Sequence, residues 1–481
     1  MTAVPGGTSL CHVGWRDNRD ALDVALAVNR LLAHGEPAWW LMSAGADHEA
    51  GDYLVALTPA RERALGDFGI RTTRWRAGIP AHAHSLTPAA TCLFAGTASK
   101  FPYFAYYALA LLRVGLDYVP CSGHELANGI LNAANLLVLP GGFATWGIDA
   151  AENTRGADDN VRDFLERGGT AIGSCGGAFY LSAGRPAWTG TAQAKPLYTH
   201  EYLQSGVGIV DIEMRVTPLA FGCPPTMETP YYHGPIYDRI AGDIEVAATF
   251  RSLSVPGRLA IDNPLDQERF RRDMADKPAI LLASGKRGRA VLFSPHPEMG
   301  DLIRKYIALD GYVRHYLPIR GYGTMRDTMR HYRVIDAPSF RLIVNAVHDL
   351  MRHAPKITSS PRVATASVDS CDLVDVCRRA AQALPALADG DDGDLLRDVA
   401  AGIRTRLDGA AARFACMRRR VDELLRLRPA YDHLAATMID HQAMTSTLAP
   451  AHALMELDLS VALLETWTRV AEFDIALGRS G

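Results

Sequence analysis

The sequence of 481 residues lacks the long apolar runs and the cysteine pairs that mark several classes of protein. No window approaches the roughly 18 consecutive apolar residues of a membrane-spanning helix, so no membrane contact is expected. The first residues, MTAVPGG, contain neither a basic nor an apolar segment, which argues against a secretory signal and favours a cytoplasmic location. Eight cysteines occur without one Cys-x-x-Cys pair, so neither a disulfide framework nor a cysteine zinc site is expected.

An excess of one charge is also missing. The formal net charge is −3, which argues against a surface that binds nucleic acid across the whole molecule. Apolar residues make up 48% and charged residues 21% of the chain, an ordinary balance for a globular protein. At about 150 residues per domain, the length predicts roughly three domains.

Three regions differ in their patterns. Residues 1–88 predict a small α/β domain, with a helix over 18–35 and a linker over 78–90. Residues 89–358 alternate strands with helices, which is typical of a parallel sheet covered on both faces. Within this region the segments PAILLAS and AVLFS flank GKRG and predict a hairpin, whereas residues 196–260, rich in Pro, Gly and Tyr, are expected to form irregular loops.

The third region, residues 359–481, reads as a bundle of helices. Apolar residues recur every three or four positions from Asp394 to Arg428, which predicts one helix of about 33 residues that Pro429 ends. A long amphipathic helix needs an apolar partner face, so we expect this region to mediate homo- or hetero-oligomer formation.

The sharpest local signal is the run Gly173-Ser174-Cys175-Gly176-Gly177 between an apolar strand and an apolar helix. A nucleophile that turns sharply from strand to helix requires small neighbours. The helix that follows would point its free N–H groups at the sulfur and favour a thiolate, and the N–H of Gly176 would hold an oxyanion. The alternative is that Cys175 is a small buried residue at the end of a strand.

Two further motifs complete a nucleophile–base–orienter set. His296 and Glu298 lie two positions apart in PHPE, where an extended backbone projects them to the same side. The carboxylate would orient the imidazole, which would face the thiol of Cys175. The turn Pro140-Gly141-Gly142 would present a second oxyanion donor, the N–H of Gly142. Taken alone, His296 would also fit an ordinary loop histidine.

These motifs resemble the class I glutamine amidotransferase-like superfamily over about residues 90–350. The matching stretches are LLVLPGGF, VRDFLERGGTAIGSCGGAFYLS, YYHGP and LFSPHPE, and they look closest to the amidotransferase-like N-terminal domain of eukaryotic-type biotin–protein ligases. The resemblance implies a flavodoxin-like α/β fold, a catalytic triad of Cys175, His296 and Glu298, and an oxyanion hole at Gly142 and Gly176. Candidates for contacting the substrate are Gly141, Phe143, Gly177, Tyr232 and His233.

Two departures from the family pattern leave the function open. Glutaminases of this class carry a glutamine in C-x-G-x-Q, whereas this chain continues from Cys175 as CGGAF, and no biotinyl-adenylate loop of the GRGRxxRxW type is present. The first hypothesis is a cysteine amidase or acyl-transfer enzyme acting on a small-molecule or peptide-like amide without a cofactor. The second is a non-catalytic ligand-binding or assembly protein. No histidine or carboxylate cluster has metal-ligand spacing, so no metal is expected.

Overall fold

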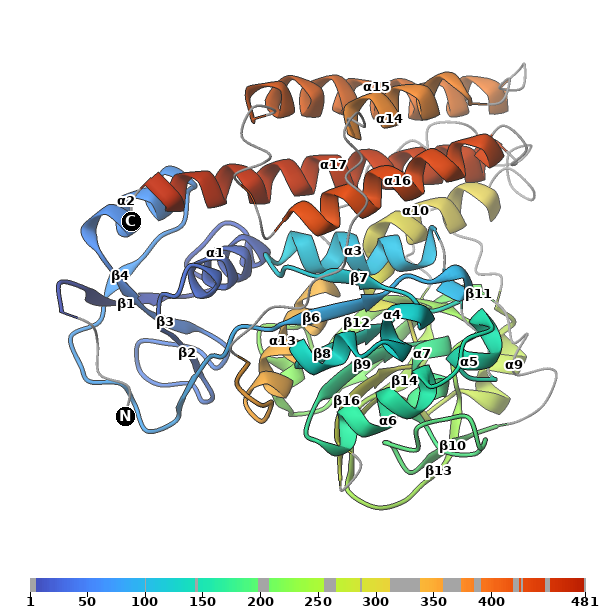
Figure 1. Ribbon diagram of the computed structural model, residues 1–481, viewed down its shortest axis with the longest axis horizontal. Coiled ribbons are helices and arrows are strands. Elements are labelled where there is room, and N and C mark those ends of the chain that lie inside the picture. The colour runs from blue at the N-terminus through green and yellow to red at the C-terminus, as the bar shows by residue number, and fades with distance from the viewer. Residues whose placement is uncertain are drawn as a thin grey trace.

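The structure, a computed structural model, describes most of the chain in twelve segments. These are residues 6–99, 101–142, 146–197, 207–254, 265–285, 288–311, 338–357, 373–384, 391–417, 424, 427–445 and 450–479. They form an N-terminal sheet beside a larger central sheet, with long C-terminal helices stacked over both (Figure 1). Within these segments, no helix is both long and apolar enough to cross a membrane.

The N-terminal unit is an antiparallel sheet of five strands in the order β4-β1-β3-β2-β5. Its elements are β1 (Ser9–Val13), α1 (Ala21–Ala33), β2 (Ala38–Leu41), β3 (Tyr53–Leu57), α2 (Pro59–Asp67), β4 (Thr73–Arg74) and β5 (Ala83–Ser85). Helix α1 begins where the Asp20 carboxylate accepts a hydrogen bond from the Leu22 N–H at 2.8 Å, which caps the first turn. Strand β5 lies in the expected linker, which therefore forms an edge strand instead of a free connection.

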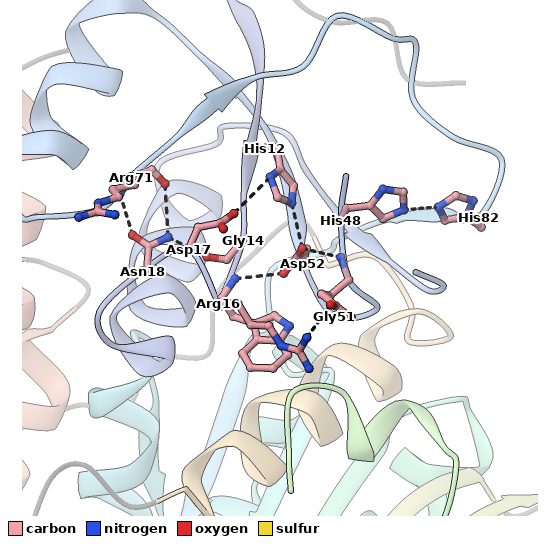
Figure 2. Close-up of polar contacts among 12 residues, drawn as sticks. His12, Gly14, Arg16, Asp17, Asn18, His48, Gly51, Asp52, Arg71 and His82 are labelled. Carbon is pink, nitrogen blue, oxygen red and sulfur yellow. Dashed lines mark hydrogen bonds and ion pairs between the residues drawn. The ribbon is translucent and has the colours of Figure 1, made fainter. Parts of the chain in front are cut away.

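Asp52 ties together the loops at one end of this sheet (Figure 2). Its carboxylate accepts hydrogen bonds from His12 Nε2 at 2.9 Å and from the backbone N–H groups of Trp15 and Glu49 at 3.0 and 2.8 Å. Burial opposes ionisation, but these bonds lower the pKa of Asp52 below its usual value.

Across the described segments, no group of three or more His, Cys, Asp or Glu side chains is placed to hold a metal ion.

The central sheet has nine strands, and five of them run parallel in the order β7-β6-β8-β9-β16. Their bounds are β6 (Thr91–Phe94), β7 (Val119–Cys121), β8 (Leu136–Leu139), β9 (Thr170–Ser174) and β16 (Gly288–Phe293). Counted along the chain this order is 2-1-3-4-5, the flavodoxin-like arrangement that the family resemblance implies. The glycine turn, the cysteine turn and the PHPE motif follow β8, β9 and β16, so all three lie at the same edge of the sheet.

Antiparallel strands extend the sheet beyond β16 in the order β12-β11-β14-β15. They are β11 (Val207–Met214), β12 (Thr226–Tyr232), β14 (Ile244–Leu253) and β15 (Pro278–Gly285), while β10 (Ala194–Pro196) and β13 (Tyr237–Ile240) pair separately. The hairpin β15–β16 confirms the prediction for this segment. The expectation of irregular loops over 196–260 is wrong for residues 207–254, which form strands with buried apolar residues such as Ile212 and Phe250 despite the Pro and Gly content of the segment. Residues 198–206 and 255–260 lie outside the described residues.

Helices cover both faces of the central sheet (Figure 1). One face carries α4 (Gly123–Ala127), α6 (Ala157–Glu166) and α7 (Gly176–Leu181), whose apolar residues share one buried cluster. The other face carries α3 (Tyr103–Arg113), α10 (Gly300–Gly311) and α13 (Phe340–Met351). The remaining short elements are η1 (Thr97–Ser99), η2 (Ile130–Ala133), α5 (Ile148–Glu152), η3 (Pro218–Ala220), α9 (Gln267–Asp273) and η4 (Pro297–Met299).

In the C-terminal region the described residues form four helices: α14 (Leu373–Gln382), α15 (Asp391–Met417), α16 (Arg428–Thr445) and α17 (Pro450–Arg479). Helix α17 lies between α15 on one side and α3, α10 and α1 on the other (Figure 1). The single helix expected over 394–428 does not reach its predicted end, because Leu424 is not helical. Helix α15 is described as far as Met417, and residues 418–423 lie outside the described residues. Pro429 does not end that helix but lies in the first turn of α16, where proline needs no N–H partner.

Buried ion pairs fasten α17 to the rest of the chain. Asp458 is completely buried and lies 2.6 Å from Lys305 Nζ of α10 and 2.5 Å from Arg406 Nη1 of α15. Arg30 of α1, also completely buried, lies 2.6 Å from Asp474 of α17. Helix α17 is therefore joined to α1, α10 and α15 by buried charged pairs.

Candidate active site

Cys175 lies in the sharp turn between β9 and α7, with φ 49° and ψ −107°. A positive φ is strained for a residue with a side chain, and such residues cluster at functional sites. The neighbours must be glycine: a Cβ on Gly173 would lie 2.5 Å from the carbonyl carbon of Gly177, and one on Gly177 would lie 2.1 Å from Leu139 O. The Cys175 N–H donates to Phe293 O at 3.1 Å, which fastens the turn to β16.

His296 and Glu298 lie together directly after β16. His296 Nδ1 is 2.7 Å from Glu298 Oε1, and both side chains are 1% exposed. Burial by itself lowers the pKa of His296, but the charge of Glu298 and hydrogen bonds to Cys175 and Glu298 raise it to about 10. The imidazole is therefore protonated at neutral pH. The 3₁₀ turn η4 brings the two side chains together, not the extended backbone that the sequence suggests.

The thiol and the imidazole converge on one backbone carbonyl. Cys175 Sγ donates to Tyr232 O at 3.2 Å, and His296 Nε2 lies 3.2 Å from the same oxygen. The Tyr232 ring is 36% exposed, and its centroid lies 6.3 Å from that of His296. His233 follows with φ 53°, and burial together with the charge of His296 lowers its pKa. Tyr232 and His233 therefore form one wall beside the cysteine.

The glycine turn after β8 lies against the same two residues. A Cβ on Gly141 would lie 2.9 Å from His296 Cε1 and 3.4 Å from Cys175 Cβ. Gly142 has φ 86°, and a Cβ there would lie 2.8 Å from the ring of Tyr103. These close approaches explain why the turn is made of glycine. Phe143, the next candidate for substrate contact, lies outside the described residues.

The two glycines that follow Cys175 differ in what their N–H groups do. The N–H of Gly176 opens helix α7 and therefore has no acceptor within the helix. The N–H of Gly177 donates to Pro140 O at 3.2 Å, so this residue faces β8. Gly176 is thus the better placed of the two to bind a negative charge near Cys175.

Comparison with known proteins supports this description of the central region. Residues 101–218 match the CobB/CobQ-like glutamine amidotransferase domain. This part of the central region is therefore similar to glutamine amidotransferases. The matched segment contains the glycine turn and Cys175 and ends before His296 and Glu298. No curated protein matches the chain.

Solved structures similar to this chain share little sequence with it. The crystal structure of a glutamine amidotransferase is 19% identical over 48% of this chain and 97% of that one, with a TM-score of 0.30. A glutamine amidotransferase from Thermotoga maritima is 12% identical over 54% of this chain and 97% of that one, with a TM-score of 0.34. A putative ThuA-like protein from Bacteroides uniformis is 14% identical over 60% of this chain and 98% of that one, with a TM-score of 0.33.

Two residues that the sequence does not single out hold the Glu298 carboxylate in place, Ser174 directly and Tyr107 through Ser174. Ser174 Oγ donates to Glu298 Oε2 at 2.9 Å, and the Tyr107 hydroxyl lies 2.5 Å from Ser174 Oγ. Because Ser174 uses its proton for the carboxylate, the Tyr107 hydroxyl donates to Ser174. The position of Ser174 directly before Cys175 could have indicated a role at this site. Nothing in the sequence links Tyr107 of α3 to it.

Proposed function

We propose that the protein is a cysteine-dependent amide hydrolase or acyl-transfer enzyme of the glutamine amidotransferase-like type. The observation that carries the proposal is the convergence of Cys175 Sγ and His296 Nε2 on one point, with Glu298 bonded to the far side of the imidazole. A nucleophile, a base and an orienting carboxylate in this relation are the parts that acyl transfer needs.

In the proposed reaction, the sulfur of Cys175 attacks the amide carbon and the carbonyl π electrons move to oxygen. The N–H groups of Gly142 and Gly176 stabilise that oxyanion. The oxyanion then reforms the carbonyl as the C–N bond breaks, and His296 gives its Nε2 proton to the departing amine. Water attacks the thioester while His296 takes its proton, which releases the acid and the free thiol. Glu298 keeps the imidazole oriented throughout.

The substrate class that fits is a small-molecule or peptide-like amide. Tyr103, Tyr232 and His233 surround the cysteine with aromatic and imidazole surface, which suits a compact amide better than a strongly charged group. The chain lacks the glutamine residue that glutaminases of this class carry after the nucleophile, so free glutamine is one substrate among several to be tested. We also propose that the domain is related to the N-terminal domain of biotin–protein ligases. Biotin ligation itself is not proposed, because the chain lacks the biotinyl-adenylate loop.

The test is ammonia release from a panel of primary amides: glutamine, asparagine, propionamide and C-terminally amidated dipeptides. We expect wild type to release ammonia from at least one of them and Cys175→Ala to release none. Cys416→Ala is the matched control, because it removes an exposed thiol far from this site in helix α15. If Cys175→Ala releases ammonia at the wild-type rate, the proposal is wrong.

One observation favours a second candidate function, a ligand-binding protein without turnover. The Tyr232 carbonyl oxygen lies 3.2 Å from both the Cys175 thiol and His296 Nε2, so it uses hydrogen-bonding positions that a substrate would need in an active enzyme. A binding protein would bind an amide of the panel with the same affinity in wild type and Cys175→Ala, and would leave it intact. Calorimetry with each amide, followed by mass analysis of the recovered ligand, separates the two candidates.

A further inference from the structure

Ser99 lies at the end of the short turn η1, which follows the parallel strand β6. Its side chain is completely buried, and its hydroxyl donates a hydrogen bond to Gly141 O at 2.9 Å. Ser99 therefore reaches from the end of one strand to the glycine turn at the end of the next. The reaction described above assigns it no part.

The carbonyl that Ser99 binds belongs to the peptide between Gly141 and Gly142. Gly141, which begins this peptide, lies against the reactive pair, since a Cβ on it would lie 3.4 Å from Cys175 Cβ and 2.9 Å from His296 Cε1. A trans peptide is planar, so its C=O and N–H point in opposite directions. Holding the carbonyl of Gly141 therefore also fixes the direction of the Gly142 N–H.

The peptide needs such an external bond because glycine stands on both sides of it. Glycine adopts positive and negative φ about equally well, so backbone preference alone does not choose between this orientation and the flipped one. In the flipped orientation the carbonyl oxygen would take the place of the N–H, and its partial negative charge would repel an oxyanion. Across the described segments, the Gly142 N–H makes no hydrogen bond and remains available to a ligand.

We propose that Ser99 is a positioning residue that sets the oxyanion-binding orientation of the Gly141–Gly142 peptide. The proposal rests on the proposed function, because an oxyanion forms only if Cys175 attacks a carbonyl group. Ser99 does not touch the reacting atoms. It acts through the peptide, because its buried hydroxyl bonds the carbonyl in one backbone orientation and would lose that bond in the flipped one.

The turn that carries Ser99 is itself held in place. Glu152 of α5 accepts hydrogen bonds from the backbone N–H groups of Ala98 at 3.1 Å and Gly123 at 2.6 Å. A Cβ on Gly96 would lie 1.8 Å from Glu152 Oε1, so the turn is closed tightly over this carboxylate. Ser99 is therefore presented from a fixed support, as a positioning residue requires.

The test uses two reagents on the full-length chain that differ in whether they form an oxyanion. Propanal adds to the sulfur of Cys175: the S–C bond forms, the carbonyl π electrons move to oxygen, and no group leaves. Iodoacetamide alkylates the same sulfur by displacing iodide, without an oxyanion. The propanal concentration that protects Cys175 from iodoacetamide by half measures adduct affinity, and peptide mass mapping identifies the residue.

We expect Ser99→Ala to weaken propanal protection at least tenfold while the rate of alkylation without propanal stays within twofold of wild type. Ser99→Thr, which keeps a hydroxyl, should restore protection. Ser460→Ala is the matched control: Ser460 is also buried and also donates to a backbone carbonyl, Glu456 O at 2.8 Å, but in helix α17. Equal melting temperatures would show that each variant is folded.

The outcomes separate this inference from the proposed function. Full propanal protection in Ser99→Ala would overturn the role of Ser99 and leave the proposed function standing. Slower alkylation of Ser99→Ala without propanal would also overturn it, because Ser99 would then act on the thiol itself. If propanal fails to protect wild-type Cys175 at all, the proposed function fails, and the role of Ser99 fails with it.

Discussion

The Ser174 hydroxyl donates a hydrogen bond to Glu298 Oε2 at 2.9 Å, so the residue before Cys175 holds the carboxylate that orients His296. The other oxygen of Glu298 bonds His296 Nδ1 at 2.7 Å. Parallel pairing of β9 with β16 places Ser174 beside Phe293, which brings the two motifs together at one edge of the sheet. With both oxygens bonded and the side chain almost fully buried, Glu298 is fixed in one orientation.

Glu298→Gln should remove a pH dependence of stability that His296 produces. The pKa of His296 is about 10 in the folded state, against an ordinary value of 6.5, so the folded state holds a proton that the unfolded state loses between these values. The stabilisation is complete below about pH 6.5 and is lost as the pH rises through about 10, with a slope of up to ~1.4 kcal/mol per pH unit. Urea unfolding at pH 6, 8 and 10 measures it.

Glu166→Gln is the control for this experiment, because it makes the same chemical change on an exposed residue at the end of α6. We expect this variant to keep the wild-type slope between pH 6 and pH 10. If Glu298→Gln keeps the same slope too, the ion pair does not set the protonation of His296.

His296→Ala should slow the alkylation of Cys175 by iodoacetamide at pH 7 by about tenfold or more. The protonated imidazole beside the sulfur favours the thiolate, which is the reactive form, and the variant loses that charge. Cys416 is exposed and serves as an internal reference in the same peptide map. Equal rates for Cys175 in wild type and variant would mean that the imidazole does not activate the thiol.

The parallel sheet and the three motifs at its strand ends could be predicted from the sequence, whereas the order of the strands is implied by the family resemblance alone. Each motif depends on local spacing: small residues around Cys175, two positions from His296 to Glu298, and a glycine turn at Gly141. Such local patterns do not depend on how the rest of the chain packs, because the steric limits at a sharp turn act on neighbouring residues. The hairpin of β15 and β16 could be predicted for the same reason.

The residues that support these motifs could not be predicted. Ser99 reaches Gly141 from another strand end, and Tyr107 reaches Ser174 from helix α3, so both contacts exist only after the sheet and helices have packed. The antiparallel strands within residues 207–254 could not be predicted from composition, because the Pro and Gly content of this segment is typical of loops. The position of Pro429 is ambiguous in the sequence, because proline suits the first turn of a helix as well as the position after its end.

Gly177→Ala should lower the free energy of unfolding by about 2 kcal/mol or more, by the cost of forcing a methyl group into a packed interior. The new Cβ would lie 2.1 Å from Leu139 O, a backbone atom of β8 that cannot move without disturbing the sheet. Gly402→Ala in helix α15 is the matched control, since its Cβ meets nothing within 4 Å. That variant should gain about 0.5–1 kcal/mol from higher helix propensity. Equal effects at both positions would contradict the tight packing of α7 on β8.

Asp458→Asn should lower the free energy of unfolding by about 3 kcal/mol, because it removes the anion from a buried pair and leaves the cations. Asp458 is completely buried beside Lys305 and Arg406. Burial alone would raise the pKa of Asp458, but the two cations outweigh this effect and lower the pKa below its usual value. Asp159→Asn breaks an ion pair whose carboxylate is 81% exposed, so it should cost no more than about 0.5 kcal/mol. Chemical denaturation of both variants at pH 7 measures the difference. Lys305 lies on α10, which directly follows the turn that holds Glu298. Asp458→Asn, which loosens the contact of α17 with α10, should therefore also slow the alkylation of Cys175. An unchanged rate would mean that the helical region stabilises the chain without supporting the site.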